Sequence, residues 1–435
     1  MSIDLSAHAK KQGIKYFLFN FTDLFGTQRA KLVPAEMVNR MQKAGAGFAG
    51  FATWLDQTPA HPDILVMPDP DSLIQLPWKP EVAWMAGDPW MEGKPLAQAP
   101  RLALKNAVAA AAQKKMTMMV GCEPEFHLIT PDGSAPSDAR DSQEKPCYDQ
   151  TAIMRRIDVI GEICSIMTQL GWGPYQNDHE DANGQFEINW NYNDALTTAD
   201  QLAFFKFLVK SIAEKHGLRA TFMPKPFINL TGNGNHAHIS VWDKKGGKNL
   251  FDDDKDEKGL SQLAYHFIGG LIHHADSLVA ITNPTVNSYK RINAPRTLSG
   301  ATWSPNTVTF GGNNRTHMVR IPDAGRIEFR LPDPSANPYL MLAGILASGM
   351  DGIDNKRSPG KRLDIDMYAE GHTVKGAKKL PLNLLDALRN LEKNTVLREA
   401  LGAETFDGYL KLKHAEWNQY CRHLTQWERD TTLDC

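Results

Sequence analysis

The stretch VGCEPEFHL, residues 120 to 128, places Glu123 and Glu125 two positions apart in an otherwise apolar run. Such a run is typical of a β-strand, in which side chains at i and i+2 lie on the same face. Two carboxylates side by side in a largely buried setting require a positive partner, because an unpaired buried charge is costly. These residues therefore indicate a site that binds cations.

Three further segments carry carboxylate or imidazole groups in strand-like surroundings. They are DHEDANGQFEINW with Glu180 and Glu187, GNGNHAHIS with His236 and His238, and GRIEFRLPDPSANPYL with Glu328. Taken singly, a glutamate pair is usually a solvated face, and a buried histidine is usually a hydrogen-bonded core residue. Together, so many carboxylates among apolar neighbours need cations between them. Oxygen-rich ligation favours magnesium or manganese, and a histidine ligand is compatible with either.

Arginines supply a second kind of positive charge. They are Arg291 in NSYKR, Arg315 in GGNNR, Arg320 in MVRIP, and Arg326 and Arg330 on either side of Glu328. Any one of them could form a surface salt bridge, but the set provides several planar donors suited to carboxylate and phosphate. Divalent ions together with an arginine array suggest phosphoryl transfer. The sequence has no GxxxxGKS or GxxxxGKT phosphate loop.

The elements that position these residues fall into two predicted domains. Residues 15–34 predict a strand, a turn at DLFG and a second strand, and the proline-rich residues 59–100 predict loops and short edge strands. A helix begins near Pro100, so we expect domains at 1–99 and 100–435. Further helices are expected at 151–170, 198–216, 261–282 and 336–352, with several more after 380.

Composition excludes several classes of protein. The chain has 435 residues, 42% of them hydrophobic, and a net charge of −2, so we expect a globular protein with no nucleic-acid or membrane partner. Five cysteines without a CxxC pair argue against a disulfide framework and a thiolate zinc site. The N-terminus lacks the apolar core of a signal peptide, and we expect a cytoplasmic location.

The ordered motifs GCEPEFHL, HEDANGQFEIN, FMPKPF, GNGNHAHIS, NPTVNSYKR, NNRTHMVRIP and RIEFRLPDPSANPYL resemble those of the glutamine synthetase family. The resemblance runs from about Phe17 to the C-terminal helices. It implies an α+β fold, with an N-terminal β-grasp domain and a catalytic domain in which helices flank a curved antiparallel sheet. It also implies hexameric rings, often stacked into dodecamers, with each site completed by a neighbour's N-terminal domain.

The resemblance assigns roles to individual residues. Glu125, Glu180 and Glu187 are similar to the ligands of the metal nearer glutamate, and Glu123, His236 and Glu328 to those of the metal at the nucleotide phosphates. Two or three Mg²⁺ or Mn²⁺ ions per site are implied. Thr231, Gly232, Arg291 and Arg330 fall where the family contacts glutamate. His238, Ser240, Arg320 and Arg326 fall at ATP, and Arg315 and Arg320 at the transferring phosphate. Tyr368 lies near the tyrosine that is adenylylated in relatives, but its neighbours differ, so we do not predict that modification.

The acceptor site departs from the ammonia-using members of the family. Those members carry an aspartate after a phenylalanine in the N-terminal domain and a glutamate on the flap that follows the NSYKR arginine. Here Ala49 follows Phe48, and residues 292–314 contain no acidic residue; Thr297 or Trp303 lies nearest the missing glutamate. Phe48, Trp54 and Trp303 are the predicted amine pocket, and Asp56 from a neighbouring subunit is the predicted base.

These features lead to one predicted reaction and several alternatives. The reaction is ATP-dependent joining of glutamate to a small amine, with methylamine favoured, through γ-glutamyl phosphate. Ammonia as in ordinary glutamine synthetase is the first alternative, and a polyamine is the second, because a long dication should need acidic residues that the flap lacks. A non-catalytic ring-forming relative and a metallohydrolase acting on phosphate esters are the alternatives from other classes.

Overall fold

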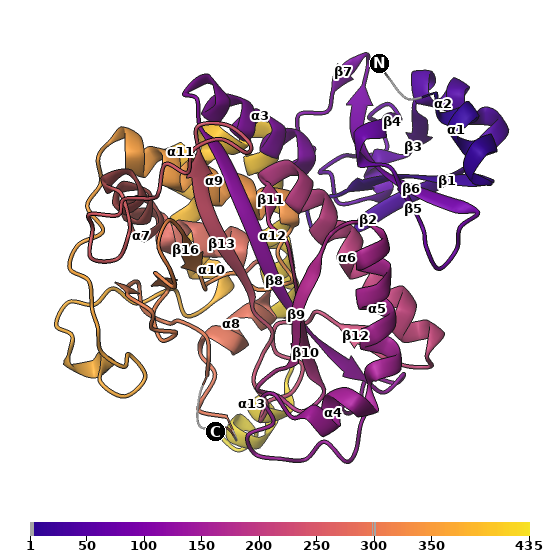
Figure 1. Ribbon diagram of the computed structural model, residues 1–435. Helices are drawn as coiled ribbons and strands as arrows, with labels where there is room; N and C mark the ends of the chain where they lie inside the picture. Colours follow the sequence, from indigo (N-terminus) through magenta and orange to yellow (C-terminus); the bar gives the residue numbers. More distant parts are fainter. Residues whose placement is uncertain (1–3, 298, 300–301) are drawn as a thin grey trace.

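Two β-sheets organise the part of the chain that the computed structural model describes, residues 4–297, 299 and 302–435 (Figure 1). The first sheet has the strand order β2-β1-β6-β4-β3, and β5 and β7 pair with β6. Its strands are β1 (Tyr16–Thr22), β2 (Gln28–Pro34), β3 (Ala46–Phe48), β4 (Ile64–Pro68), β5 (Ile74–Gln75), β6 (Val82–Met91) and β7 (Lys94–Pro95). Side chains of helices α1 (Leu5–Gln12) and α2 (Val38–Ala44) share a small core with β1. The predicted strand, turn and strand at 15–34 are confirmed.

Strand β6 corrects the expectation of loops and short edge strands for residues 59–100. It has ten residues and lies inside the sheet, parallel to β1 on one side and antiparallel to β4 on the other. Trp84 and Met85 are consecutive and both buried, so the strand is covered on both faces. Its proline, Pro89, lies near the end of the strand, where the missing N–H is tolerated.

The second sheet has the order β14-β15-β16-β13-β8-β10-β9, with β11 and β12 also pairing with β8. Within the described residues, the strand pairs of this sheet are antiparallel, and the exception is the parallel pair β14 with β15. The strands are β8 (Thr117–Ile129), β9 (Pro174–His179), β10 (Gln185–Trp190), β11 (Asn193–Asp194), β12 (Arg219–Thr221), β13 (Asn235–Trp242), β14 (Phe310–Gly311), β15 (Val319–Arg320) and β16 (Ile327–Phe329). The long strand β8 runs through the centre of the molecule (Figure 1).

Helices surround this sheet, and most begin near the predicted positions. They are α3 (Pro100–Gln113), α4 (Gln150–Arg155), α5 (Ile157–Gln169), α6 (Ala195–Lys215), α7 (Gln262–Thr282), α8 (Val286–Ile292), α9 (Pro338–Asp354), α10 (Leu384–Glu392), α11 (Thr395–Leu401), α12 (Ala403–Tyr420) and α13 (Gln426–Thr432). The helix predicted at 151–170 is divided at Arg156. Helix α8 was not predicted, although Thr285 and Ser288 form a capping box at its start.

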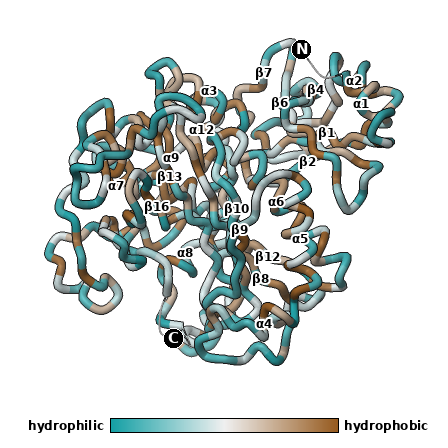
Figure 2. The backbone as a smooth tube through the Cα atoms, viewed as in Figure 1, coloured by the Kyte–Doolittle hydropathy of each residue, from teal (hydrophilic) through white to brown (hydrophobic). Residues whose placement is uncertain are grey.

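The main core lies between the second sheet and its helices. Helix α6 packs on β8, and α7 packs against α9. Figure 2 shows hydrophobic segments along α9 and β13 in the interior, with hydrophilic loops at the periphery. The sheet that carries the polar motifs is therefore held rigidly by an apolar layer behind it.

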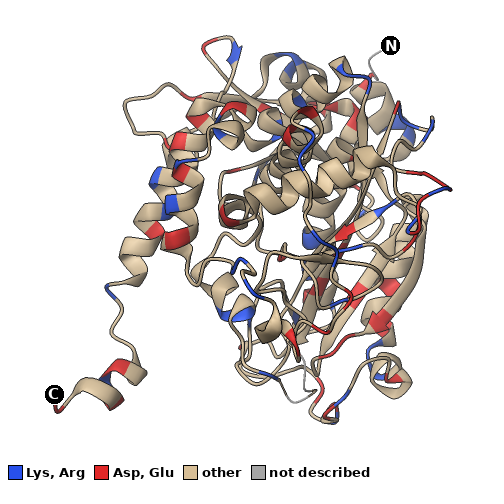
Figure 3. Ribbon diagram, turned by 90° about the vertical axis from the view of Figure 1, so that its left-hand side faces the viewer, with Lys and Arg blue, Asp and Glu red and all other residues tan. Residues whose placement is uncertain are grey.

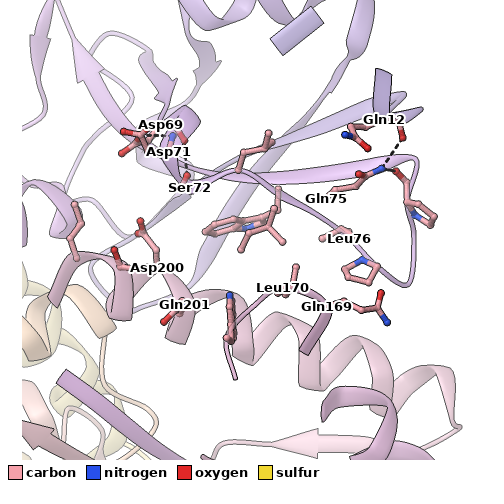
Figure 4. Close-up of a pocket in the computed structure, with 18 of the residues that line it drawn as sticks. Gln12, Asp69, Asp71, Ser72, Gln75, Leu76, Gln169, Leu170, Asp200 and Gln201 are labelled. Carbon is pink, nitrogen blue, oxygen red and sulfur yellow. Dashed lines mark hydrogen bonds between the residues drawn. The ribbon is translucent and has the colours of Figure 1, made fainter. Parts of the chain in front are cut away.

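Arg101 on α3 connects the two sheets. Its guanidinium, which is 3% exposed, donates to Asp69 after β4, Asp88 on β6 and Asp200 on α6 at 2.8 to 3.0 Å. Tyr339 of α9 also donates to Asp200 at 2.7 Å. Asp69, Arg101 and Asp200 are among the residues that line a cavity of about 960 Å³, and Asp69 and Asp200 are labelled in Figure 4. One cation thus joins the N-terminal sheet to two helices of the catalytic sheet.

The C-terminal helix α13 stands apart from the rest of the molecule (Figure 3). Leu424, Trp427 and Leu433 in and around it are about 70% exposed. Among the described helices, none combines the length and hydrophobicity that a bilayer crossing requires.

Candidate active site

A row of carboxylates crosses the catalytic sheet. Glu125 on β8 lies directly opposite Glu187 on β10, which lies opposite Asp178 on β9. Directly opposed residues of antiparallel strands place their side chains on one face. Glu180 follows β9, and ligand atoms of Glu125, Glu180 and Glu187 all lie within 4.8 Å of one another. The three residues predicted for the metal nearer glutamate therefore converge.

The second group lies on the other side of β8. His236 on β13 is opposite Glu123, and His238 is opposite Glu328 on β16. Nδ1 of His236 is 3.6 Å from Glu328 and 3.8 Å from Glu123, so the set predicted at the nucleotide phosphates is also assembled. Nε2 of His238 is closer still to Glu123, at 3.1 Å. Ligand atoms of Glu123, His238 and Glu328 also lie within 4.8 Å of one another, so His238 is a further potential metal ligand.

The electrostatics of the carboxylate row favour a cation. Burial, followed by the charges of neighbouring carboxylates, raises the pKa of Glu180 and Glu187 well above the usual range and that of Asp178 to about 6. Glu328 behaves differently, because burial opposes ionisation but Arg330, His236 and His238 lower its pKa to about 2. A donor set of carboxylates and imidazoles fits Mg²⁺ or Mn²⁺.

The arginines predicted at the phosphates, Arg315, Arg320 and Arg326, and the predicted glutamate ligand Arg330 are not all in one place. Arg320 donates to one oxygen of Glu328 at 2.8 Å, and Arg330 donates to the other at 2.5 Å. Arg326 lies 3.0 Å from Nδ1 of His238 and also binds Asp323. Arg315 is exposed to solvent. Three of these arginines therefore surround the second carboxylate group, whereas the fourth does not contact it.

A cavity of about 360 Å³ adjoins this second group. Glu123, His238, Ser240 and Arg326 all line it, together with the aromatic side chains of Tyr175, Tyr192 and Trp242. All the residues predicted to contact ATP except Arg320 thus line one pocket, and the predicted metal ligand Glu123 lines it too. Such a pocket can hold a planar ring beside aromatic side chains and phosphates beside the cationic groups.

Three of the predicted glutamate-binding residues, Thr231, Gly232 and Arg291, lie beside the first carboxylate group, whereas Arg330 lies at Glu328. Arg291, at the end of α8, is 3% exposed and donates to the carbonyl of Leu331 at 3.2 Å. A Cβ atom on Gly234 would lie only 2.9 Å from Nη2 of Arg291 and 3.1 Å from Glu125, and one on Gly232 would lie 2.3 Å from the carbonyl of Pro224. The glycine-rich loop therefore allows the guanidinium, the carboxylate and the backbone to approach closely.

The predicted amine-pocket residues are not brought together within one chain. Phe48 packs edge-on against Phe21, with ring centroids 5.2 Å apart. Trp54 is 47% exposed and stacks on Phe25 at 4.9 Å. Asp56 forms an ion pair with Lys411 of α12 at 2.7 Å.

Trp303 lies on the flap, and its indole nitrogen is buried. The roles of Phe48, Trp54, Asp56 and Trp303 stay predictions. Tyr368 is half-buried, and its raised pKa results from burial, although Arg330 and Arg291 act in the opposite direction. Its hydroxyl therefore lies close to the glutamate-binding arginines.

Sequence reasoning missed several groups that support the metal ligands. Gln185 is fully buried, and its amide donates to Glu125 at 2.8 Å and to the carbonyl of Gly232 at 3.2 Å. Asp141 accepts from His179 and from the backbone N–H of Gly184, both at 2.6 Å. These contacts fix the turn between Glu180 and Glu187. The only signal in the sequence was the polar composition of DHEDANGQ.

Comparison with known proteins agrees with this geometry. The catalytic-domain family of glutamine synthetase matches residues 97–432. A protein of Rhizobium meliloti called glutamine synthetase is 64% identical over 100% of both chains, and a glutamate–methylamine ligase of Methyloversatilis universalis is 43% identical over 98% of this chain and 97% of its own. A solved structure of a GmaS/ADP complex is 65% identical over 100% of both chains, with a TM-score of 0.96.

The chain belongs to the glutamine synthetase family. It is an ATP-dependent ligase of that family, with the mixed α/β fold predicted from the motifs. The family uses ATP and divalent metal ions, and the acidic groups described above can hold such ions.

Proposed function

We propose that this ligase joins the γ-carboxylate of glutamate to methylamine, giving γ-glutamylmethylamide, ADP and phosphate. The observation that carries the proposal is the flap, since residues 292–314 include one arginine and four asparagines but no carboxylate. Ammonium is recognised only by charge and hydrogen bonds, so this flap offers it little. A methyl group can gain from contact with aromatic side chains, by about 1–3 kcal/mol.

The names of relatives support two acceptors. The Rhizobium meliloti protein is called glutamine synthetase at 64% identity, whereas the GmaS/ADP complex is 65% identical and the Methyloversatilis universalis relative is a glutamate–methylamine ligase. Similar levels of identity therefore go with different names. The acid-free flap favours methylamine, and ammonia is the alternative.

The proposed reaction uses the two halves of the site in turn. The γ-carboxylate of glutamate attacks the γ-phosphate of ATP to form γ-glutamyl phosphate, and the amine then displaces phosphate. Divalent ions, when bound, offset the negative charge of the phosphates and of the attacking carboxylate. Arg291 and Arg330 orient glutamate, while Arg320, with Arg315 if the exposed loop closes on it, stabilises charge on the transferring phosphate. His238, Ser240 and Arg326 hold the nucleotide.

A neighbouring subunit completes this proposed site. Phe48, Trp54 and Asp56 come from the N-terminal sheet, and they are proposed to reach the flap of the next subunit in a ring of identical chains. The ring is proposed to be hexameric and stacked as a dodecamer. Trp303 on the flap would then face Phe48 and Trp54 across the interface.

The acceptor is tested by comparing kcat/KM for ammonia, methylamine, ethylamine and putrescine under one set of conditions, with ADP release as the signal. We expect methylamine to exceed ammonia by roughly 10-fold or more, the effect of one methyl-sized contact. A higher kcat/KM for ammonia would contradict the proposal and favour the reaction of an ordinary glutamine synthetase. Metal-dependent ADP release with any amine would exclude a non-catalytic ring-forming relative.

Arg291→Lys is expected to raise the KM for glutamate and to lower kcat. An ammonium group cannot reproduce the two-pronged contact of a guanidinium with a carboxylate, so we expect a loss of roughly 10- to 100-fold in kcat/KM for glutamate. Lys290→Arg on the same helix is the matched control, because Lys290 is exposed. Unchanged KM and kcat for glutamate in Arg291→Lys would show that Arg291 does not bind glutamate.

A further inference from the structure

Asp181 is an acidic residue next to Glu180 to which neither the predictions nor the proposed reaction assigns a role. It is 8% exposed and lies in the turn between β9 and β10. Its Oδ2 accepts hydrogen bonds from Thr231, at 2.5 Å, and from Ser299 of the flap. Within the described part of the chain, its Oδ1 accepts only from the thiol of Cys147, at 3.8 Å. One carboxylate oxygen is thus fully used, and the other is weakly bonded.

The place of Asp181 matters because it adjoins the flap. Thr231 links Asp181 to Thr297, since the hydroxyls of the two threonines are 3.3 Å apart. Thr297 is one of the two flap positions nearest the missing glutamate. The structure therefore brings a carboxylate from a different loop to the part of the flap where ammonia-using relatives carry one.

We infer that Asp181 binds the ammonium group of the acceptor amine through Oδ1, in place of the absent flap glutamate. The inference rests on the proposed function, namely transfer of the glutamyl group to a small amine. Asp181 also contacts Thr231, at a position where the family binds glutamate. An alkylammonium held by Oδ1 would therefore lie beside the acyl group, which its nitrogen attacks only after it has given a proton to a base, the role predicted for Asp56 of a neighbouring subunit.

The charge balance around Asp181 supports a cationic ligand. Within the described residues, the ion pairs include none to Asp181, and its hydrogen-bond donors are two hydroxyls and a thiol. A buried carboxylate without a cation is costly, and an alkylammonium supplies both the charge and a strong N–H donor.

The alternative is a structural role, in which Asp181 only connects the flap to the Thr231 loop. That role needs a hydrogen-bond acceptor but no charge, so Asp181→Asn separates the two. Asparagine has nearly the same shape, and its amide oxygen can still accept from Thr231 and Ser299. It removes the negative charge that would attract an alkylammonium.

The experiment compares methylamine with hydroxylamine in Asp181→Asn. Methylamine has a pKa near that of lysine, about 10.4, so it is almost wholly protonated at neutral pH. Hydroxylamine has a similar size but is largely uncharged there, and it traps γ-glutamyl phosphate as a hydroxamate. We expect the KM for methylamine to rise by roughly 10- to 100-fold, the loss of one charge-assisted hydrogen bond. The KM values for glutamate, ATP and hydroxylamine should change by no more than about twofold.

The matched control is Asp132→Asn. Asp132 is an exposed carboxylate that also accepts from two hydroxyls, those of Thr130 and Ser134, but it lies on a surface turn. We expect unchanged kinetics with both nucleophiles. Equal losses with methylamine and hydroxylamine in Asp181→Asn, or a protein that no longer folds, would assign Asp181 a structural role and overturn the inference.

The outcome is independent of which amine the enzyme prefers. If ammonia proves the better acceptor, its cation should show the same selective rise in KM in Asp181→Asn. Failure of the methylamine proposal and failure of the Asp181 inference therefore give different results. Normal methylamine kinetics in Asp181→Asn would also reject the inference.

Discussion

Glu328→Gln is expected to reduce ATP-dependent ligation by at least about 100-fold, because loss of a partner that merely supports a metal ligand already costs roughly 10- to 100-fold. Glu328 is 1% exposed and lies within 3.6 Å of His236 and 3.9 Å of His238. Glutamine keeps its shape but loses the charge that a divalent ion requires. The measurements are ADP release and Mn²⁺ binding to the variant by titration calorimetry, in the absence of nucleotide.

Glu257→Gln is the control for this prediction. Glu257 is exposed and pairs with Arg362 on the surface, so its loss should leave both activity and Mn²⁺ binding unchanged. The binding measurement matters, because Glu328 also neutralises Arg320 and Arg330. Weaker catalysis with unaltered Mn²⁺ affinity would show that Glu328 serves the arginines and not a metal.

Arg101→Ala is expected to lower the free energy of unfolding by about 3–5 kcal/mol. Its removal leaves Asp69, Asp88 and Asp200 close together without the cation that they share. The measurement is urea-induced unfolding at a fixed protein concentration, because the proposed association of subunits would add a concentration-dependent contribution. The N-terminal sheet should become more susceptible to proteolysis, since Arg101 connects it to α3 and α6.

Lys105→Ala provides the comparison. Lys105 also binds Asp88, at 2.7 Å, but its side chain is 37% exposed. A surface pair of this kind contributes about 0–1 kcal/mol. If both substitutions lower the free energy of unfolding by the same small amount, the buried cluster around Arg101 does not stabilise the contact between the two sheets.

The sequence predicted the strands that carry the candidate metal ligands better than it predicted the strands of the N-terminal sheet. Glu123, Glu125, Glu187 and His236 lie on strands whose alternation is visible in the sequence, and antiparallel pairing then brings them to one face. Strand β6 was not recognised, because prolines on both sides of VAWMAG concealed a run that is buried on both faces. The family resemblance, not periodicity, supplied the pairing of distant motifs.

Interactions between segments far apart in sequence could not be predicted from composition. Asp181 meets Ser299 across 118 positions, and Arg101 meets Asp200 across 99. In their own segments of the sequence, Asp181, Arg101 and Asp200 look like ordinary surface charges. Only the arrangement of strands and loops shows that Asp181 lies beside the flap and that Arg101 lies between the two sheets.

The position of Glu123 and Glu125 on one strand has a consequence for how the family can diversify. Successive same-face residues of a strand are about 7 Å apart, and β8 is held on both sides by β13 and β10. The separation between the proposed nucleotide and glutamate ends of the site is therefore set by backbone geometry, which no side-chain substitution alters. Among the described residues, the flap is linked to Asp181 and Thr231 through hydroxyl contacts, those of Thr231, Thr297 and Ser299. A lineage can therefore exchange one nucleophile for another by changing these two loops, while the phosphorylation of glutamate proceeds on an unaltered scaffold.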